Sequence, residues 1–402
     1  MIVIGGGAAG FFAAINLAMR KPEWQIQIVE KSGKLLSKVR VSGGGRCNVT
    51  HACFDPAELV QNYPRGKKEL RQVFSRFGPA DTIAWFKAQG IVLKTERDGR
   101  MFPVSNSSES IISCFLDLAS RMHIQVSTGV DVKSIEKSQE GFVLQCKNQS
   151  LKADLIIAAS GGNSKPEFYA LFRKLGHTIV QPSPSLFTFN LPGEEICQRL
   201  QGISVQNAEV KLKNTSLRFN GPVLITHWGL SGPAVLKLSA FAARELHDMH
   251  YEGCVVVNWL FALKVPEIDA RLRQWQEEKR KSLPFTQVPF DIPKRLWEFL
   301  CVKAGIHNDR TWAEIPKKNL LSLAHFLGAS EFQMSGRSVF KEEFVTAGGI
   351  SLKEVDFTSM QSKVVPGLYF CGEVLDIDGI TGGFNFQNAW STAWIAAMNC
   401  GT

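Results

Sequence analysis

The chain opens on a glycine-rich stretch that restricts the possible folds more than any other feature. Residues 1–4 are apolar, which suits a short buried parallel strand. The next six residues, Gly-Gly-Gly-Ala-Ala-Gly, fit the G-x-G-x-x-G pattern, and residues 11–19 carry apolar side chains at helical spacing. Pro22 ends that helix, and residues 25–30 are typical of a second strand. A strand, a glycine turn, a helix and a second strand in this order predict a dinucleotide-binding βαβ unit.

Each glycine of this turn has a physical role. Gly5 permits the tight turn, Gly7 lets a pyrophosphate approach the backbone, and Gly10 lets the helix pack against the sheet. The N-terminus of the helix offers N–H groups and partial positive charge to phosphates. Glu30 ends the second strand, where a carboxylate accepts hydrogen bonds from a ribose 2′-OH and repels a 2′-phosphate. The pattern therefore favours FAD or NAD over NADP.

Two further glycine-rich stretches follow in the first half of the chain. Residues 42–48, Ser-Gly-Gly-Gly-Arg-Cys-Asn, come after a polar and basic linker at 31–40. Three glycines in a row disfavour helix and strand and allow close backbone approach to a flat ligand, which Arg46 and Asn48 have the donors to bind. Residues 154–162 form an apolar strand that runs into two glycines, a second contact point for a dinucleotide.

The end of the chain repeats this arrangement. Residues 364–373 are a strand that runs into Gly372 and Glu373, and a glycine-rich turn then leads into an apolar, Ala-rich helix over 386–398. The N-terminus of that helix favours the electron-rich edge of a ligand such as a reduced flavin. No second G-x-G-x-x-G follows a strand, so the sequence does not encode a second nucleotide-binding unit for tightly held NAD(P)H.

The composition is that of an ordinary globular protein. The chain has 402 residues, of which 45% are hydrophobic and 21% charged, enough for two or three domains. No apolar run is long enough to span a membrane, and the first strand begins at Met1 where a signal peptide would lie, so we expect a cytoplasmic protein with no membrane partner. Nine scattered cysteines without a C-x-x-C pair argue against a dithiol centre or a bound metal.

The charge pattern leaves two interpretations open. The formal net charge is +9, which permits an acidic partner but does not require one. The most basic short stretch spans residues 63–77, where five basic side chains alternate with aromatic ones: Arg65, Lys67, Lys68, Arg71 and Arg76 with Tyr63, Phe74 and Phe77. Such interleaving is typical of proteins that bind single-stranded or looped RNA, and it also suits a solvated helix face.

The motifs together resemble those of the YhiN/BaiN-like family of FAD-dependent oxidoreductases, over essentially the whole chain. They are Val-Ile-Gly-Gly-Gly-Ala-Ala-Gly, Ser-Gly-Gly-Gly-Arg-Cys-Asn, Thr-His-Trp-Gly-Leu-Ser-Gly-Pro-Ala, Thr-Ala-Gly-Gly-Ile, Gly-Leu-Tyr-Phe-Cys-Gly-Glu-Val-Leu-Asp and Gly-Gly-Phe-Asn-Phe-Gln. The resemblance implies an α/β fold with a Rossmann-like FAD-binding domain built from both chain ends. An inserted β-barrel-like unit and a helical unit interrupt it. We expect the FAD domain at 1–185 plus 343–402, the β unit at 186–265 plus 329–342, and the helical unit at 266–328.

The motifs and the resemblance also predict the cofactor site. The resemblance places the pyrophosphate at the first glycine turn, the adenosine ribose at Glu30, the adenine beside Val132, and the flavin among residues 42–48, Gly372, Glu373 and the turn at 383–387. The expected cofactor-binding residues are Gly5, Gly7, Ala8, Ala9, Gly10, Glu30, Lys31, Ser42, Gly43, Gly44, Arg46, Cys47, Asn48, Val132, Ser160, Gly161, Gly372, Glu373, Gly383, Phe384, Asn385, Phe386 and Gln387.

The resemblance implies more than one activity. The first is NAD(P)H-driven reduction of an electron-poor C=C bond, with a uridine of ribosomal RNA as the favoured substrate and a small conjugated enone such as an oxo-bile acid as the alternative. The second is a flavin amine oxidase. Apart from the resemblance, a non-catalytic FAD-bearing RNA-binding or sensor protein is a third hypothesis. Reduction of an alkene needs a proton donor, for which the candidates are His227, Cys47, Asp376 and Asp378.

Overall fold

The first strands of the chain form the centre of a parallel sheet. In the computed structural model, which describes residues 1–336 and 345–401, seven strands are ordered β19-β20-β21-β10-β1-β2-β6. The five strands from β21 to β6 are parallel, and β20 and β19 extend the sheet antiparallel at one edge. The bounds are β1 (Ile2–Ile4), β2 (Gln27–Glu30), β6 (Gln125–Thr128), β10 (Ile156–Ala158), β19 (Val355–Asp356), β20 (Gln361–Ser362) and β21 (Leu368–Phe370). The central strands β21, β10 and β1 are fully buried and apolar, and helices α1 (Ala8–Arg20) and α14 (Phe384–Asn399) pack against them.

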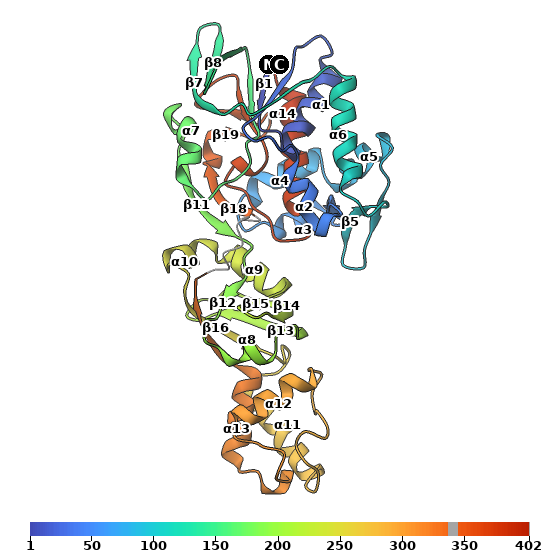
Figure 1. Cartoon of the computed structure of the whole chain (residues 1–402), viewed down its shortest axis with the longest axis vertical. Helices are drawn as coiled ribbons and strands as arrows, with labels where there is room; N and C mark the ends of the chain where they lie inside the picture. The colour runs from blue at the N-terminus through green and yellow to red at the C-terminus, as the bar shows by residue number, and fades with distance from the viewer. Residues whose placement is uncertain (337–344, 402) are drawn as a thin grey trace. The chain divides into compact units, whose positions relative to one another are not determined.

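The two glycine-led helices lie side by side (Figure 1). Helix α1 (Ala8–Arg20) begins after Gly7 and ends at Lys21, one residue before Pro22. Helix α14 (Phe384–Asn399) begins at Phe384, two residues before the predicted start, because Gly383 takes the left-handed conformation that turns the chain into the helix. Aromatic side chains from α1, α14 and their neighbours form a buried cluster that includes Phe12, Phe86, Phe115 and Trp390.

The remaining elements of this part surround the sheet. Three short strands are ordered β3-β5-β4, and β7, β8 and β9 form an antiparallel sheet. Strand β11 pairs antiparallel with β18. The bounds are α2 (Ser37–Gly45), β3 (Thr50–His51), α3 (Pro56–Leu59), α4 (Lys67–Arg76), α5 (Pro79–Ala88), β4 (Leu93–Thr95), β5 (Arg100–Pro103), α6 (Glu109–Arg121), β7 (Val132–Ser138), β8 (Gly141–Cys146), β9 (Ser150–Ala153), α7 (Ala170–Lys174), β11 (Ile179–Ser185) and β18 (Val345–Ile350). The polar linker predicted at 31–40 thus contains the start of a helix.

The chain divides into two compact units. The first contains Met1–Ser185 and Val345–Thr402, and the second contains Leu186–Phe344. We call them the cofactor unit and the inserted unit. The predicted boundary between residues 185 and 186 coincides with the observed boundary between the two units. The predicted boundary between residues 342 and 343 lies outside the described residues.

The inserted unit is an antiparallel sheet with helices attached. Its six strands are ordered β12-β15-β14-β13-β16-β17, and three longer helices occupy the stretch between β16 and β17. One hydrophobic cluster runs through both parts and includes Trp259, Trp297 and Trp312. The bounds are β12 (Phe189–Asn190), α8 (Glu195–Arg199), β13 (Ser204–Leu212), β14 (Arg218–Ile225), β15 (Gly229–Ser231), α9 (Pro233–Phe241), α10 (Ala243–Asp248), β16 (Glu252–Asn258), α11 (Val265–Glu278), α12 (Lys294–Lys303), α13 (Lys317–Gly328) and β17 (Ser330–Ser335). The predicted class, a Rossmann-like α/β protein interrupted by a β unit and helices, is confirmed.

Two global features bear on function. Within residues 1–336 and 345–401, no helix combines the length and apolar character needed to cross a membrane. None of the nine cysteines forms a disulfide in the described part of the chain.

Candidate cofactor-binding site

The first glycine turn combines two close contacts with one open side. A Cβ on Gly5 would lie 2.4 Å from the carbonyl oxygen of Ala159, and a Cβ on Gly10 would lie 1.9 Å from the carbonyl oxygen of Gly5. A Cβ on Gly7 would meet no atom within 4 Å. Because α1 starts at Ala8 without a side-chain cap, its first N–H groups are available to a ligand there. The turn thus has the form of a phosphate cradle.

Glu30 is fixed at the end of β2 beside this turn. One of its carboxylate oxygens accepts a hydrogen bond from the Gly6 amide at 2.9 Å, and the other accepts from the Ser32 amide at 2.8 Å. Each oxygen has a further lone pair for a hydroxyl group. The Val130 amide donates to the Glu30 carbonyl oxygen at 2.9 Å, which brings the start of β7, with Val132, near the end of β2. The ammonium group of Lys31 lies 4.7 Å from the centre of the Phe168 ring.

The glycine loop at 42–48 is irregular backbone inside α2. Ser42, Gly43 and Gly44 depart from helical geometry, and both glycines have positive φ. A Cβ on Gly43 would lie 2.7 Å from the Phe102 ring, whereas one on Gly44 would meet nothing within 4 Å. Arg46 pairs with Glu96 at 2.6 Å and stacks on Phe102, so its guanidinium is engaged within the protein.

The turn before α14 is held by side chains from distant parts of the chain. The Tyr63 hydroxyl donates to the Phe384 carbonyl oxygen at 2.6 Å. His51 Nδ1 lies 3.0 Å from the Gly382 carbonyl oxygen, and its ring stacks on Phe384. The Gln387 side-chain oxygen accepts from the hydroxyls of Thr50 at 2.6 Å and Thr82 at 3.0 Å.

Two amide side chains complete this bracing. Asn385 both donates to and accepts from the backbone of Gly379, at 2.9 and 2.8 Å. With its amide oriented to satisfy both groups, Asn48 donates to the Thr50 carbonyl oxygen and accepts from the Gly383 amide at 3.0 Å. The 42–48 loop and the C-terminal turn are therefore joined directly.

A third edge of the site follows β10 and β21. Gly161 has positive φ, and a Cβ on it would meet nothing within 4 Å. The neighbouring Ser160 hydroxyl is buried without a hydrogen-bond partner in the described part of the chain. The Gly372 amide donates to the Thr392 hydroxyl at 2.9 Å. Glu373 accepts from the Thr346 amide at 2.9 Å and pairs with Lys38 at 2.7 Å.

The residues present fit FAD. Open space beside Gly7, Gly44 and Gly161, together with the orphaned Ser160 hydroxyl, lies along segments that all belong to the cofactor unit. A dinucleotide needs such a series of close backbone approaches, with a helix N-terminus at the phosphates and an acidic group at the ribose.

The four candidate proton donors differ in their surroundings. Cys47 is fully buried, and burial raises the pKa of its thiol to about 12. Asp376 is buried and accepts from the Gly348 amide at 3.0 Å. Asp378 has no exposed surface, pairs with Arg65 and accepts from the Ser185 hydroxyl at 2.7 Å. Burial raises the pKa of Asp378, although Arg65 acts in the opposite direction.

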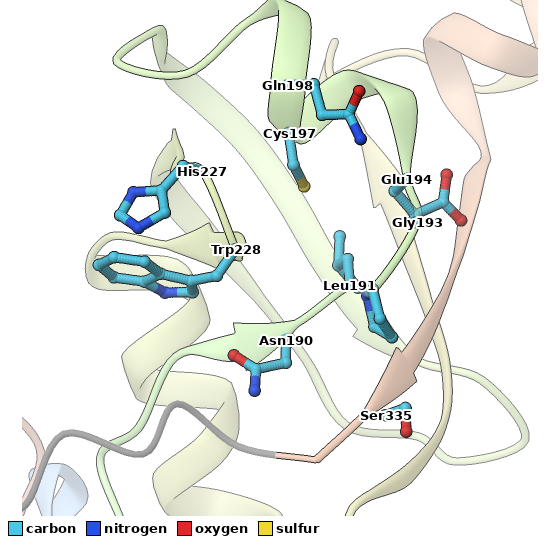
Figure 2. A pocket seen from close by; sticks show the side chains of 10 residues that line it. Asn190, Leu191, Gly193, Glu194, Cys197, Gln198, His227, Trp228 and Ser335 are labelled. Carbon is cyan, nitrogen blue, oxygen red and sulfur yellow. The ribbon is translucent and has the colours of Figure 1, made fainter.

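His227 is the one candidate in the inserted unit. Its exposed ring lies 4.0 Å from the Trp228 ring, centre to centre, in an edge-on arrangement. Figure 2 shows both rings at a cavity of about 210 Å³ that Asn190, Glu194 and Ser335 also line. The structure thus brings Cys47, Asp376 and Asp378 into one unit with the cofactor cradle, while His227 belongs to the other unit.

Sequence reasoning missed the role of three residues. His51, Tyr63 and Arg65 brace the C-terminal turn, and the only sequence signal for His51 is its place three residues after the glycine-rich motif at 42–48. Of the two interpretations of residues 63–77, the structure shows the solvated helix face, with most of the basic side chains exposed and the aromatic side chains buried. Tyr63, Phe74 and Phe77 are 0%, 3% and 4% exposed because they form the inner face of an amphipathic helix and its ends.

Comparisons with known proteins agree with this geometry. The family model described as HI0933-like protein Rossmann domain matches residues 1–399. A Haemophilus influenzae protein named ribosomal RNA dihydrouridine synthase is 30% identical over 99% of this chain and 97% of its own length. A Clostridium scindens protein named 3-dehydro-bile acid delta(4,6)-reductase is 28% identical over 98% of this chain and 97% of its own length.

A solved structure supports the fold. The 3-ketosteroid delta1-dehydrogenase from Sterolibacterium denitrificans is 11% identical, with a TM-score of 0.50 over 99% of this chain and 98% of that protein. At that identity the likeness concerns the fold alone. Because the family model matches nearly the whole chain and the cradle has the features of a dinucleotide site, this protein belongs to the HI0933-like family and is an FAD-dependent oxidoreductase.

Proposed function

We propose that this protein uses NADH or NADPH to reduce an electron-poor C=C bond, and that its substrate is a uridine of ribosomal RNA. The observation that carries the proposal is full-length similarity to two proteins named ribosomal RNA dihydrouridine synthase, from Haemophilus influenzae and Escherichia coli, at 30% and 29% identity. The reductase relative from Clostridium scindens is named for reducing C=C bonds in a different molecule. Saturation of an alkene is the chemistry that these names share.

The chain's own residues bind and orient the cofactor. When bound, FAD supplies the hydride chemistry that amino-acid side chains lack. The amides at the start of α1 hold the pyrophosphate, and Glu30 holds the ribose. The N-terminus of α14 directs partial positive charge at an electron-rich ligand edge, and Tyr63 and His51 keep that turn in place. The remaining predicted cofactor contacts are part of this proposal.

A reduced alkene also needs a proton on the carbon next to the one that receives hydride. We propose His227 as its donor, because histidine is the side chain that most often transfers protons in enzymes and the His227 ring is exposed at a cavity. Cys47, with a thiol pKa of about 12, is a poor acid at pH 7. Asp376 accepts from the Gly348 amide, and Asp378 accepts from Arg65 and from the Ser185 hydroxyl, which suits carboxylates that hold neighbouring segments in place.

A small conjugated enone is the second candidate substrate. It rests on the Clostridium scindens reductase, whose 28% identity is close to that of the two synthases. A flavin amine oxidase is a further alternative for the same cofactor site.

Anaerobic mixing with the flavin absorbance as readout separates these functions. We expect NADPH or NADH to bleach the flavin, and a uridine-containing RNA to restore its colour while forming dihydrouridine. Restoration by a bile-acid enone and not by RNA would favour the second candidate. Bleaching by small amines and not by either nicotinamide would contradict a reductase, and a flavin that responds to nothing would indicate a non-catalytic role. His227→Gln should slow the RNA-dependent phase and leave the nicotinamide phase unchanged.

A further inference from the structure

The basic stretch at 63–77 forms a helix with two distinct faces. Residues at spacings of three and four along α4 lie on one side of a helix. The buried side contains Leu70, Val73, Phe74 and, just past the helix end, Phe77. The exposed side contains Lys68, Arg71, Gln72 and Ser75 at the same spacing. All four exposed side chains can donate hydrogen bonds, and two of them carry positive charge.

These four side chains line a groove on the cofactor unit. Asp55, Pro56 and Ala57, at the start of α3, complete its lining, and this open groove has a volume of about 540 Å³. No aromatic side chain lines it. Lys68 and Arg71 form no ion pair with any residue in the described part of the chain. Elsewhere on this unit Arg40, Arg46 and Arg65 are neutralised by Glu109, Glu96 and Asp378, respectively.

The other charges near the groove have identifiable roles. Asp55 lines it, and its carboxylate accepts a hydrogen bond from the Ala57 amide at 2.8 Å as the cap of α3. Helix α4 also carries Lys67, Arg76 and one acidic residue, Glu69. Arg76 donates to the Thr358 carbonyl oxygen and keeps its charge, and Glu58 lies on α3. The exposed face of α4 is therefore cationic, with one carboxylate at its rim.

We propose that this groove binds the phosphate backbone of single-stranded RNA, and this rests on the proposed function for the identity of the polyanion. Lys68 and Ser75 are two turns apart, about 10 Å along the helix axis, which is long enough to contact more than one phosphate. Cationic and hydroxyl donors without an aromatic platform suit phosphates and not bases.

The groove is also anchored to the cofactor site within the same unit. Arg65, just before α4, pairs with Asp378, and Tyr63 donates to the Phe384 carbonyl oxygen. A Cβ on Gly66 would lie 2.7 Å from the Ile377 side chain, so the start of α4 is packed on the segment that leads into the C-terminal turn. An RNA strand held on α4 is thus held by an element that is fixed to the turn before α14.

Binding of a fluorescein-labelled single-stranded RNA of about 20 nucleotides to the FAD-loaded protein tests this, with anisotropy measured at several salt concentrations. Lys68→Ala/Arg71→Ala should weaken binding about tenfold or more at low salt. Loss of two phosphate contacts should also reduce the slope of log affinity against log salt by about 1.4. Asp55→Asn keeps a good helix cap and removes one negative charge, so it should strengthen binding. The control is Lys152→Ala, which removes an exposed lysine on β9. It should change the RNA affinity and the salt slope by no more than the loss of a single phosphate contact would.

Further measurements keep the outcomes distinct. FAD content and melting temperature establish that each variant is folded. If the double variant and the control have the same RNA affinity and the same salt slope, the groove does not bind RNA and the proposal is contradicted. A raised KM for NADPH with unchanged RNA binding would also overturn it, because the phosphates would then belong to the nicotinamide cofactor. Equal formation of dihydrouridine by the wild type and the double variant, at high and at low salt, would contradict RNA binding in the groove and would support the proposed function. If the wild type forms none, the function fails irrespective of binding.

Discussion

The two glycine turns of the cofactor unit lead into neighbouring helices but are built in different ways. The turn before α1 is built mainly from its own backbone: Gly5 packs against Gly10, Glu30 reaches Gly6 from the next strand, and the one distant contact is Ala159, just after β10. The turn before α14 is assembled by Tyr63, His51, Asn48 and Thr50, which lie more than 300 residues away in sequence. The first turn is therefore sensitive to its own backbone geometry, and the second to side chains elsewhere.

The largest expected effects are those of valine substitutions at two glycines of the turn before α1, and the two should differ in kind. Gly10→Val should prevent folding, because even its Cβ would lie 1.9 Å from the Gly5 carbonyl oxygen. Gly7→Val should fold without FAD, because Gly7 has extended backbone geometry and open space where the phosphate fits. Circular dichroism and flavin absorbance of the purified variants measure both outcomes. A yellow Gly7→Val protein would contradict the phosphate cradle.

The assembled turn should depend next on its buried ion pair. Asp378→Ala removes the carboxylate that pairs with Arg65, whose side chain is 10% exposed, and should lower the free energy of unfolding by about 3–5 kcal/mol. Asp98→Ala removes a partner of Arg100 from an exposed pair and should cost about 0–1 kcal/mol. Denaturant unfolding of both proteins gives the comparison. Equal losses would show that the Asp378 pair adds nothing to the turn.

A smaller effect is expected at the ribose end of the turn before α1. Glu30→Ala should weaken FAD binding by roughly 1.5–3 kcal/mol, a tenfold to hundredfold rise in Kd, because a charge-assisted hydrogen bond is lost. Glu30 also accepts from the amides of Gly6 and Ser32, so some stability should be lost as well. Glu30→Gln keeps one acceptor oxygen and should fall between the wild type and Glu30→Ala. Calorimetric titration of the apoprotein with FAD is the measurement, and an unchanged Kd would remove Glu30 from the site.

The smallest expected effect concerns one hydroxyl of the assembled turn. Tyr63→Phe leaves the buried Phe384 carbonyl oxygen without its 2.6 Å donor and should cost about 1–2 kcal/mol of stability. Tyr369→Phe removes a hydroxyl that accepts from the Gly401 amide at 3.4 Å near the chain end and should cost less. Thermal unfolding followed by flavin fluorescence measures both. A larger loss for Tyr369→Phe would show that the turn does not need Tyr63.

The same contrast explains what the sequence could predict. The βαβ unit followed from residues 1–30 because its glycines, helix and strands are adjacent, and the Ala-rich helix at the C-terminus was foreseen to within two residues of its start. The bracing by Tyr63, His51 and Arg65 was not, since those contacts join residues separated by more than 300 positions. From composition alone, the basic and the aromatic residues of 63–77 could not be assigned to different faces of a helix. Their spacing of three and four residues does assign them, with the aromatic side chains buried and the cationic side chains exposed. The cofactor contacts and proton donors remain predictions.

The central claim is that this FAD-dependent protein makes dihydrouridine in ribosomal RNA. Its most direct test is mass spectrometry of nucleosides from ribosomal RNA of cells that lack the gene, complemented with the wild type or with Gly7→Val. We predict that deletion lowers the dihydrouridine content, that the wild type restores it, and that Gly7→Val does not. A dihydrouridine content that is the same with and without the gene would contradict the account and move the substrate to a small conjugated alkene.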